Sequence, residues 1–265
     1  MSRLLAFIRR SLRQENSLQQ SENLQRYHDL QTELQQLRPR VEFLEHRLTN
    51  YYTDRWNVLY RAADYMVNAE LEGDYAEFGV YKGTTFGFAA SLFQVLFPKM
   101  RFLAFDSFEG LPELKGIDYR QDGFSSGFFK GQFAATEDEF RNNILNSLPQ
   151  LAPERLIITK VWFDQTLTHE TARNIQLNRL ACIWIDCDLY ESAVPVLKFI
   201  TPYLSVGTVI LFDEWRGFRN LPDYGEQRAC REWLEANPGL TLNEAISYGF
   251  QGLVFTVASL PHAVE

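Results

Sequence analysis

Cysteine is scarce in this sequence of 265 residues, and its few positions exclude several kinds of site. The chain has 3 cysteines, and none forms the C-x-x-C pair that is typical of zinc or redox motifs. Cys182 and Cys187 fall inside or directly after a predicted buried strand, and no histidine lies near Cys187 in the sequence. We therefore expect free thiols, a reducing cytoplasmic compartment and no catalytic cysteine.

The sequence also lacks a long apolar run and an excess of basic residues. No segment approaches the roughly 20 apolar residues that a membrane span needs. The 34 acidic and 26 basic residues give a net charge of −8, which disfavours nucleic acid as a partner. Residues 1–14 carry four arginines among apolar side chains, so weak contact with a membrane surface and an ordinary terminal helix are both open interpretations.

Glycine is absent from residues 1–72, where Pro39 is the one proline. This composition predicts helix, either kinked at Pro39 or restarted there. Apolar residues recur in steps of three and four, as in the seam of a coiled coil: Tyr27, Leu30, Leu34, Leu37, Val41, Leu44, Leu48 and Tyr51. We expect these helices to form a homo-oligomer; the alternative is a helical hairpin that folds back on its own domain.

Gly73 marks a change in composition, which divides the chain into a helical extension, 1–72, and a compact domain, 73–265. Within this domain, 181–185 and 208–212 are continuous apolar runs of strand length, and a helical pattern separates them. Strands that are apolar on both faces belong to parallel sheets that helices cover on both sides. The fold class is therefore α/β.

Acidic residues follow directly after both apolar runs. Asp186 and Asp188 follow the first run, and Asp213 and Glu214 follow the second. Because neighbouring parallel strands end at the same edge of a sheet, where ligands bind, these carboxylates should share a small volume. Crowded carboxylates suit Mg²⁺ or another divalent cation. Asp188 has a second interpretation as a helix cap, because Glu191 follows it at capping-box spacing.

A second site is predicted where a short strand, 74–79, turns into a helix. Gly79 and Gly83 let the backbone pass close to a ligand, but the turn lacks the third glycine of a dinucleotide fingerprint. Asp106 ends the next strand, where an acid can bind ribose hydroxyls. These features favour a nucleoside cofactor without a pyrophosphate, a description that S-adenosylmethionine fits.

Five motifs appear in an order that resembles one enzyme family. They are E-F-G-V-Y-K-G (77–83), D-S-F-E-G-L-P (106–112), W-F-D-Q-T-L (162–167), D-C-D-L-Y-E-S (186–192) and D-E-W (213–215). Together they resemble the macrocin and mycinamicin type of sugar O-methyltransferase, a metal-dependent branch of the class I S-adenosylmethionine-dependent methyltransferases. The resemblance covers about Tyr75 to Phe255 and leaves the helical extension outside it.

The resemblance implies a Rossmann-like sheet of seven strands whose last strand is antiparallel. It implies that Glu77, Gly79, Gly83 and Thr84 surround the amino-acid end of S-adenosylmethionine, that Asp106 and Ser107 bind its ribose, and that Asp164 lies on the adenine side. The metal ligands that it implies are Asp186, Asp213 and Glu214. The family more often has aspartate where this chain has Glu214.

The function expected from these observations is methyl transfer from S-adenosylmethionine to a hydroxyl of a small-molecule or glycan acceptor, assisted by Mg²⁺. Asp186 and Asp188 are the candidate catalytic residues, with Asp188 as base or as support for the ligands, and the two acids can exchange roles. An aromatic hydroxyl is an alternative acceptor. Another alternative is a coiled-coil scaffold that binds nucleotide without turnover. The glycine- and phenylalanine-rich segment 106–136 is interpreted as a lid.

Overall fold

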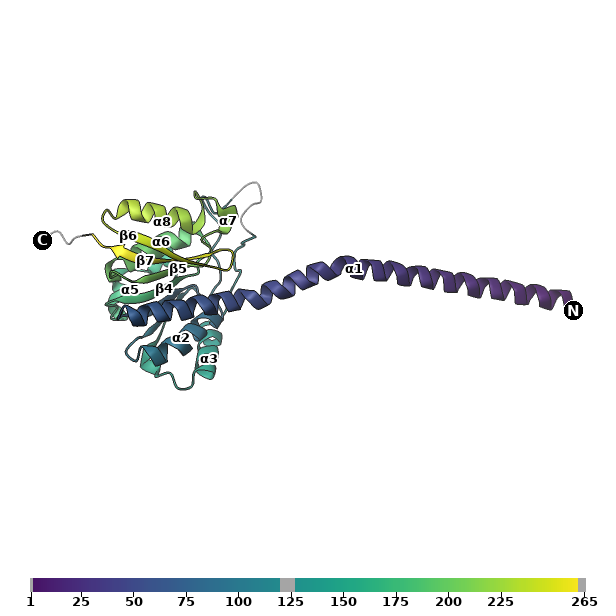
Figure 1. The fold of residues 1–265 in the computed structure, drawn as a ribbon, viewed down its shortest axis with the longest axis horizontal. Helices are drawn as coiled ribbons and strands as arrows, with labels where there is room; N and C mark the ends of the chain where they lie inside the picture. The colour runs from purple at the N-terminus through teal and green to yellow at the C-terminus, as the bar shows by residue number, and fades with distance from the viewer. Residues whose placement is uncertain (1, 120–126, 262–265) are drawn as a thin grey trace. The chain divides into compact units, whose positions relative to one another are not determined.

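The computed structural model in Figure 1 describes residues 2–119 and 127–261, with the side chains of 2–23 and 48 left out. It divides into two compact units, Met1–Tyr51 and Tyr52–Glu265. The predicted boundary between Glu72 and Gly73 therefore lies inside the second unit.

The first unit consists of helix α1, which runs from Ser2 to Asn68 and continues into the second unit. Pro39 lies inside α1, so the helix does not restart there, and the alternative of a helical hairpin is wrong because α1 is continuous. The predicted seam is exposed, with exposed fractions from 42% at Leu37 to 65% at Leu34. Leu48 and the residues of 1–14 lie outside the side chains that the structure describes.

The last turns of α1 belong to the core of the second unit. Val58, Leu59, Ala63 and Met66 are buried there, each with an exposed fraction of 2% or less. Their spacing places one face of the helix against the sheet. This burial explains why the compact unit begins well before Gly73.

A mixed sheet of seven strands forms the centre of the second unit, in the order β3-β2-β1-β4-β5-β7-β6. Strands β1 to β5 are parallel, and β7 pairs antiparallel with β5 and β6. The expected sheet with an antiparallel last strand is therefore confirmed. The strands are β1 Asp74–Phe78, β2 Phe102–Asp106, β3 Leu156–Lys160, β4 Leu180–Ile185, β5 Val209–Phe212, β6 Thr241–Tyr248 and β7 Gly252–Ser259.

Helices cover both faces of this sheet, as Figure 1 shows for α2 and α3 on one side and α6 and α8 on the other. On β4, Cys182 and Trp184 pack with the first layer, whereas Ile183 and Ile185 pack with the second. The helices after α1 are α2 Thr84–Leu96, α3 Glu137–Ser147, α4 Phe163–Thr166, α5 His169–Asn174, α6 Tyr190–Ile200, α7 Gly217–Asn220 and α8 Gly225–Ala236, with 3-10 turns at Pro153–Arg155 and Thr201–Tyr203.

Both faces of β4 are thus buried, which is why its sequence is a continuous apolar run and not an alternating one. None of the helices in the described part of the chain has the length and apolarity needed to cross a membrane.

Candidate active site

The acids that follow β4 and β5 lie side by side, as their strand positions predict. The last paired residues of these strands are Ile185 and Phe212, so Asp186 and Asp213 both come next. The Asp213 amide donates a hydrogen bond to the Ile185 carbonyl at 3.0 Å, which holds the two strand ends together. The sheet edge therefore brings together acids that are distant in the sequence.

Three of the predicted acids can present oxygens to a common point. Asp186, Asp188 and Glu214 each offer a carboxylate oxygen, and these oxygens all lie within 4.8 Å of one another. Asp188 is buried and has a left-handed backbone with a φ of 63°. Few residues other than glycine adopt this conformation, although aspartate tolerates it better than most. The chain therefore turns sharply at Asp188 to direct it into the cluster.

The interpretation of Asp188 as a helix cap is wrong. Helix α6 begins at Tyr190, and its first amides are capped by Asp118, which comes from the long segment after β2. The two Asp118 oxygens accept hydrogen bonds from the amides of Tyr190 and Glu191 at 2.9 and 3.0 Å. Asp118 was missed because only the fold brings it to this helix.

The segment predicted to be a lid is thus attached to the start of α6 at Asp118. Its residues 120–126, which include Gly123 and Phe124, lie outside the described part of the chain. Leu111 and Gly131 pair through a backbone hydrogen bond of 2.9 Å, so the two ends of the segment approach each other. The lid remains an interpretation.

Glu226, in the first turn of α8, is a further acid at the site that sequence reasoning missed. Its exposed fraction is 1%, and its Oε2 accepts a hydrogen bond from the Glu214 amide at 3.1 Å. Within the described residues, Glu226 Oε1 and Glu214 Oε2 are buried and have no hydrogen-bond partner. Buried polar atoms are normally paired, so these two oxygens are available to a ligand.

The electrostatics of the cluster support the same conclusion. Burial, followed by repulsion from Asp213, raises the pKa of Asp186 from 3.8 to about 7, although Arg55 opposes this shift. Burial and then repulsion from neighbouring acids also raise the pKa values of Asp188, Glu214 and Glu226 well above their ordinary range. The ionised forms of these acids are therefore disfavoured in the cluster, and a divalent cation would offset the repulsion between them.

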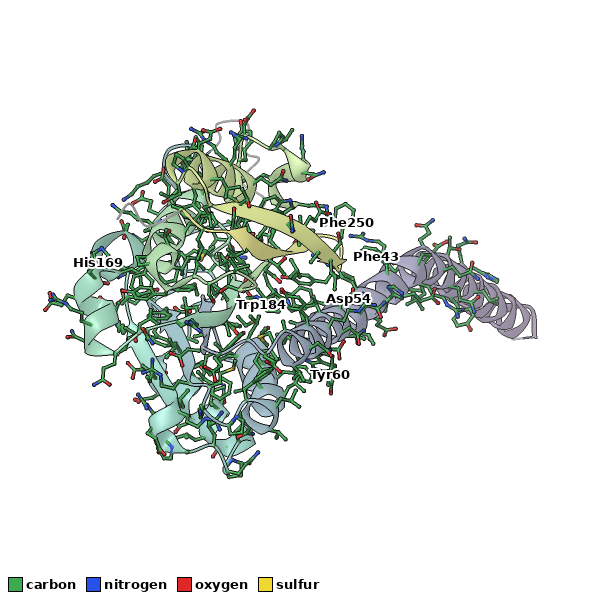
Figure 2. All side chains as sticks on the ribbon, turned by 60° about the vertical axis from the view of Figure 1, so that its left-hand side comes forward. Phe43, Asp54, Tyr60, His169, Trp184 and Phe250 are labelled. Carbon is green, nitrogen blue, oxygen red and sulfur yellow. The ribbon has the colours of Figure 1, made fainter. Side chains whose placement is uncertain are left out.

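Arg55 of α1 reaches into the cluster and was also missed, because it lies in the part of the sequence assigned to the extension. Its Nη1 donates to Asp186 Oδ2 and to Thr85 Oγ1, both at 3.0 Å, and its Nη2 pairs with Asp213 Oδ2. Its guanidinium lies 5.6 Å from the ring centroid of Trp184, which is at the centre of the unit in Figure 2.

Asp213, a predicted metal ligand, has partners for both of its oxygens. Arg55 pairs with Oδ2, and the Tyr248 hydroxyl lies 3.0 Å from Oδ1. Asp213 is also buried, with an exposed fraction of 5%. It is therefore more firmly held by protein groups than Asp186 or Glu214.

The predicted cofactor turn follows β1 directly, but its glycines have structural causes. Gly79 has a φ of 88°, and a Cβ there would lie 1.9 Å from the Asp186 carbonyl oxygen. Gly83 has a φ of 84°, and a Cβ there would lie 2.8 Å from the Phe140 ring. Packing within the protein, and not only the approach of a ligand, therefore requires glycine at both positions.

Asp106 also organises this turn. Its Oδ2 accepts hydrogen bonds from the amides of Val80 and Tyr81 at 2.8 and 3.2 Å, and its Oδ1 accepts one from Phe108 at 2.7 Å. Burial nevertheless raises the pKa of Asp106 above its ordinary value. Ser107 accepts a hydrogen bond from the Glu109 amide at 3.1 Å, so its hydroxyl shapes the loop after β2.

The other predicted cofactor residues occupy different depths at the same edge of the sheet. Glu77 is buried beneath the turn, where its carboxylate accepts a hydrogen bond from the Tyr75 hydroxyl and burial raises its pKa. Thr84 begins α2 and is exposed. Asp164 is exposed on α4, after β3, on the far side of β2 from the turn.

Among the residues that the structure describes, cysteine and histidine are not part of the acidic cluster. The expected free thiols are confirmed, since Cys182, Cys187 and Cys230 are unpaired and buried. Burial raises the pKa of the Cys187 thiol, which disfavours the reactive thiolate. His169 is exposed on α5, away from Trp184 (Figure 2).

Comparison with known proteins identifies the family. The sequence model of the macrocin O-methyltransferase (TylF) family matches residues 12–235. The chain belongs to the macrocin O-methyltransferase family. The resemblance drawn from the five motifs is therefore confirmed. Its expected limit near Tyr75 is wrong, because the family match begins inside α1 and includes Arg55.

Two curated relatives of this chain come from Streptomyces. The demethyldecarbamoylnovobiocin O-methyltransferase of Streptomyces niveus is 26% identical over 152 residues, which cover 57% of this chain and 55% of that protein. The 8-demethyl-8-(2,3-dimethoxy-α-L-rhamnosyl)-tetracenomycin-C 4′-O-methyltransferase of Streptomyces olivaceus is 28% identical over 147 residues, or 55% and 54% of the two chains. The chain thus spans about half the length of the curated relatives it matches.

Solved structures agree on the fold. The O-methyltransferase NovP aligns with a TM-score of 0.62 and 21% identity, covering 77% of this chain and 80% of that one. CalS11, a calicheamicin methyltransferase, aligns with a TM-score of 0.61 and 25% identity, covering 80% and 79%. The arrangement of the sheet is therefore that of known O-methyltransferases.

Proposed function

We propose that this protein transfers a methyl group from S-adenosylmethionine to a hydroxyl of a sugar or glycoside, with the assistance of a divalent cation such as Mg²⁺. The observation that carries the proposal is the meeting of Asp186, Asp188 and Glu214 oxygens within 4.8 Å at the sheet edge of a macrocin O-methyltransferase family member. The sugar class is favoured because the name of the Streptomyces olivaceus relative describes a rhamnosyl compound.

The residues present fit a hard divalent cation. Carboxylate oxygens are the ligands that Mg²⁺ prefers, and Glu214 Oε2 and Glu226 Oε1 are buried without partners among the described residues. We assign Asp186 and Glu214 as ligands, with Glu226 as an additional acid beside them. Asp213 can join this set only if its contact with Arg55 changes.

The turn after β1 fits the amino-acid end of S-adenosylmethionine. Helix α2 begins at Thr84, its N-cap Gly83 provides no side-chain cap, and Tyr81, Lys82 and Thr84 around this start are exposed. Helix starts with free amides attract carboxylates. Asp106, held by amides of the same turn, lies where ribose hydroxyls can be bound.

The chain's own residues would position the acceptor and receive its proton. S-adenosylmethionine supplies the methyl group, and a bound divalent cation supplies the positive charge that makes a nearby hydroxyl more acidic. Asp188 lies within 4.8 Å of the Asp186 and Glu214 oxygens, so it can accept the proton of a hydroxyl held there. Burial of this cluster strengthens every charge interaction in it.

A methyl-transfer assay on the full chain tests this proposal. Labelled S-adenosylmethionine would be combined with a panel of nucleotide sugars, glycosides and catechols, with Mg²⁺ or with a chelator. We expect transfer to a sugar hydroxyl, a loss of at least about 100-fold for Asp186→Asn, and near wild-type activity for Asp223→Asn, an exposed acid on the surface.

Three results would contradict parts of the proposal. Full activity in chelator would exclude assistance by a metal. Transfer to catechols alone would make the acceptor an aromatic hydroxyl. Binding of S-adenosylmethionine without transfer to any acceptor would favour a binding scaffold over an enzyme.

We also propose that the exposed seam of α1 pairs with the same seam of a second copy. The seven described seam residues are each at least 42% exposed, and they recur at coiled-coil spacing. Leu34→Glu with Leu37→Glu should convert an oligomer to a monomer in sedimentation equilibrium, whereas Glu33→Gln on the same helix should not. A monomeric wild-type chain would exclude this pairing.

A further inference from the structure

Arg55 is the feature of this site that the proposed function does not use. The residue belongs to the compact unit, in the part of α1 whose apolar face packs on the sheet. Its side chain is 7% exposed and extends to the ends of β4 and β5, where it meets Asp186 and Asp213. A buried guanidinium is costly unless it is paired, so the contacts with these two aspartates are needed to offset the cost of its burial.

The guanidinium joins the ends of the two strands beside the acids that would hold a cation. Nη1 contacts Asp186 Oδ2 at 3.0 Å, and Nη2 pairs with the corresponding oxygen of Asp213. A divalent cation held by Asp186 and Glu214 would lie close to this fixed positive charge, and like charges repel strongly in a buried site. Arginine remains protonated, so a change of pH does not relieve this repulsion.

Two other contacts of Arg55 show how it could give up Asp213 without being left unpaired. Nη1 also donates to Thr85 Oγ1 at 3.0 Å, in the first turn of α2. The Trp184 ring lies 5.6 Å from the guanidinium carbon, within the range of a cation–π contact. The guanidinium would therefore keep its contacts with α2 and β4 if its contact with Asp213 opened.

We propose that Arg55 is a resident counter-ion that competes with the divalent cation for Asp186 and Asp213, and that α1 thereby sets the affinity of the site for metal. This inference rests on the proposed function, because it assumes that a cation binds at this cluster. Without metal, the guanidinium pairs with both aspartates and offsets part of their negative charge. With metal, the contact between Arg55 and Asp213 opens and that aspartate can join the ligands.

Binding of Mn²⁺ to the full chain, followed by electron paramagnetic resonance without S-adenosylmethionine, tests the competition directly. Arg55→Met removes the charge and keeps most of the side-chain length, and Arg61→Met is the matched control at an exposed position of the same helix. We expect Arg55→Met to bind Mn²⁺ at least about tenfold more tightly than the wild type, because the competing charge is gone. Arg61→Met should bind as the wild type does.

Thermal unfolding provides a second readout that does not depend on activity. In chelator, Arg55→Met should unfold at a lower temperature than the wild type, and Mn²⁺ should raise its unfolding temperature by a larger amount. If Arg55→Met does not fold, Arg55→Lys replaces it. Lysine keeps the charge without the planar fork, so we expect an affinity for Mn²⁺ about threefold above the wild type.

Different outcomes separate this inference from the proposed function. If the wild type binds Mn²⁺, Asp186→Asn abolishes the binding, and the folded Arg55 variant binds no more tightly, then the competition is refuted and the metal site stands. If neither protein binds Mn²⁺ at millimolar concentrations, both metal assistance and the competition are refuted. Weaker binding by the variant would show that Arg55 holds the ligands in place and does not compete with metal.

Discussion

Replacement of Gly79 by alanine should destabilise the compact unit even in the absence of cofactor. The new Cβ would lie 1.9 Å from the Asp186 carbonyl oxygen and 3.0 Å from its carbonyl carbon. Both atoms belong to the backbone at the end of β4, which β1 and β5 hold on either side. The close contact therefore cannot be relieved by a rotation of a side chain.

The expected cost has two parts. A left-handed backbone, with φ of 88° at Gly79, costs a residue with a Cβ about 1–2 kcal/mol. Insertion of a methyl group into a packed position costs about 1–3 kcal/mol more. The sum is about 2–5 kcal/mol, which for a unit of this size corresponds to a decrease of roughly 4–20 °C in Tm.

Gly131→Ala is the matched control. Gly131 has a similar φ of 78°, but among the described residues no atom lies within 4 Å of the position of its Cβ. This variant should therefore show the conformational part of the cost without the steric part. Urea unfolding, followed by tryptophan fluorescence, should give a difference of about 1–3 kcal/mol between the two variants.

An equal free energy of unfolding for Gly79→Ala and Gly131→Ala would refute the reasoning. In that case the absence of a side chain at Gly79 would serve only the approach of a ligand. A larger loss for Gly79→Ala, measured without cofactor, would show that the approach of β1 to Asp186 requires glycine.

Further predictions concern three other features of the unit. Burial raises the pKa of Asp118 from 3.8 to about 6, so the stability that this group contributes is present at low pH and is lost as the pH rises through about 6. Between about pH 4 and pH 7 the free energy of unfolding, measured by urea titration, should fall by about 2–3 kcal/mol less in Asp118→Asn than in the wild type. Parallel curves of this free energy against pH for the two proteins would contradict the prediction. Glu226→Gln should raise Tm in chelator, because one buried repelling acid is removed, and it should weaken the binding of Mn²⁺. If Tm and the affinity for Mn²⁺ both rise or both fall, Glu226 does not belong to the cation site. A thiol reagent should label the native protein far more slowly than the urea-unfolded protein, since all 3 cysteines are buried.

Local patterns in the sequence were sufficient for the layout of the sheet. Continuous apolar runs such as 181–185 predict central parallel strands, because residues on both faces must be apolar when helices cover both. The acids after β4 and β5 could then be placed together, since neighbouring parallel strands end at the same edge. The prediction of an acidic site between Asp186 and Glu214 needed no further information.

Local patterns failed where one residue had two compatible interpretations. Asp188 and Glu191 have the spacing of a capping box, but α6 is capped by Asp118 from a different segment. The glycines of the turn after β1 fit the approach of a ligand, yet the Asp186 carbonyl and the Phe140 ring occupy the space beside them. In both cases the deciding atoms are far away in the sequence.

The sequence by itself determined the α/β class, the position of acids directly after the strands, and the family. These depend on periodicity and on motifs that are contiguous in the chain. Only the tertiary structure decided that Arg55 and Glu226 belong to the site, since each comes from a helix whose own pattern gives no sign of it. The physical reason is that charges interact through space. An arginine 131 positions before Asp186 contributes as strongly as a neighbour once the fold brings the two to 3.0 Å.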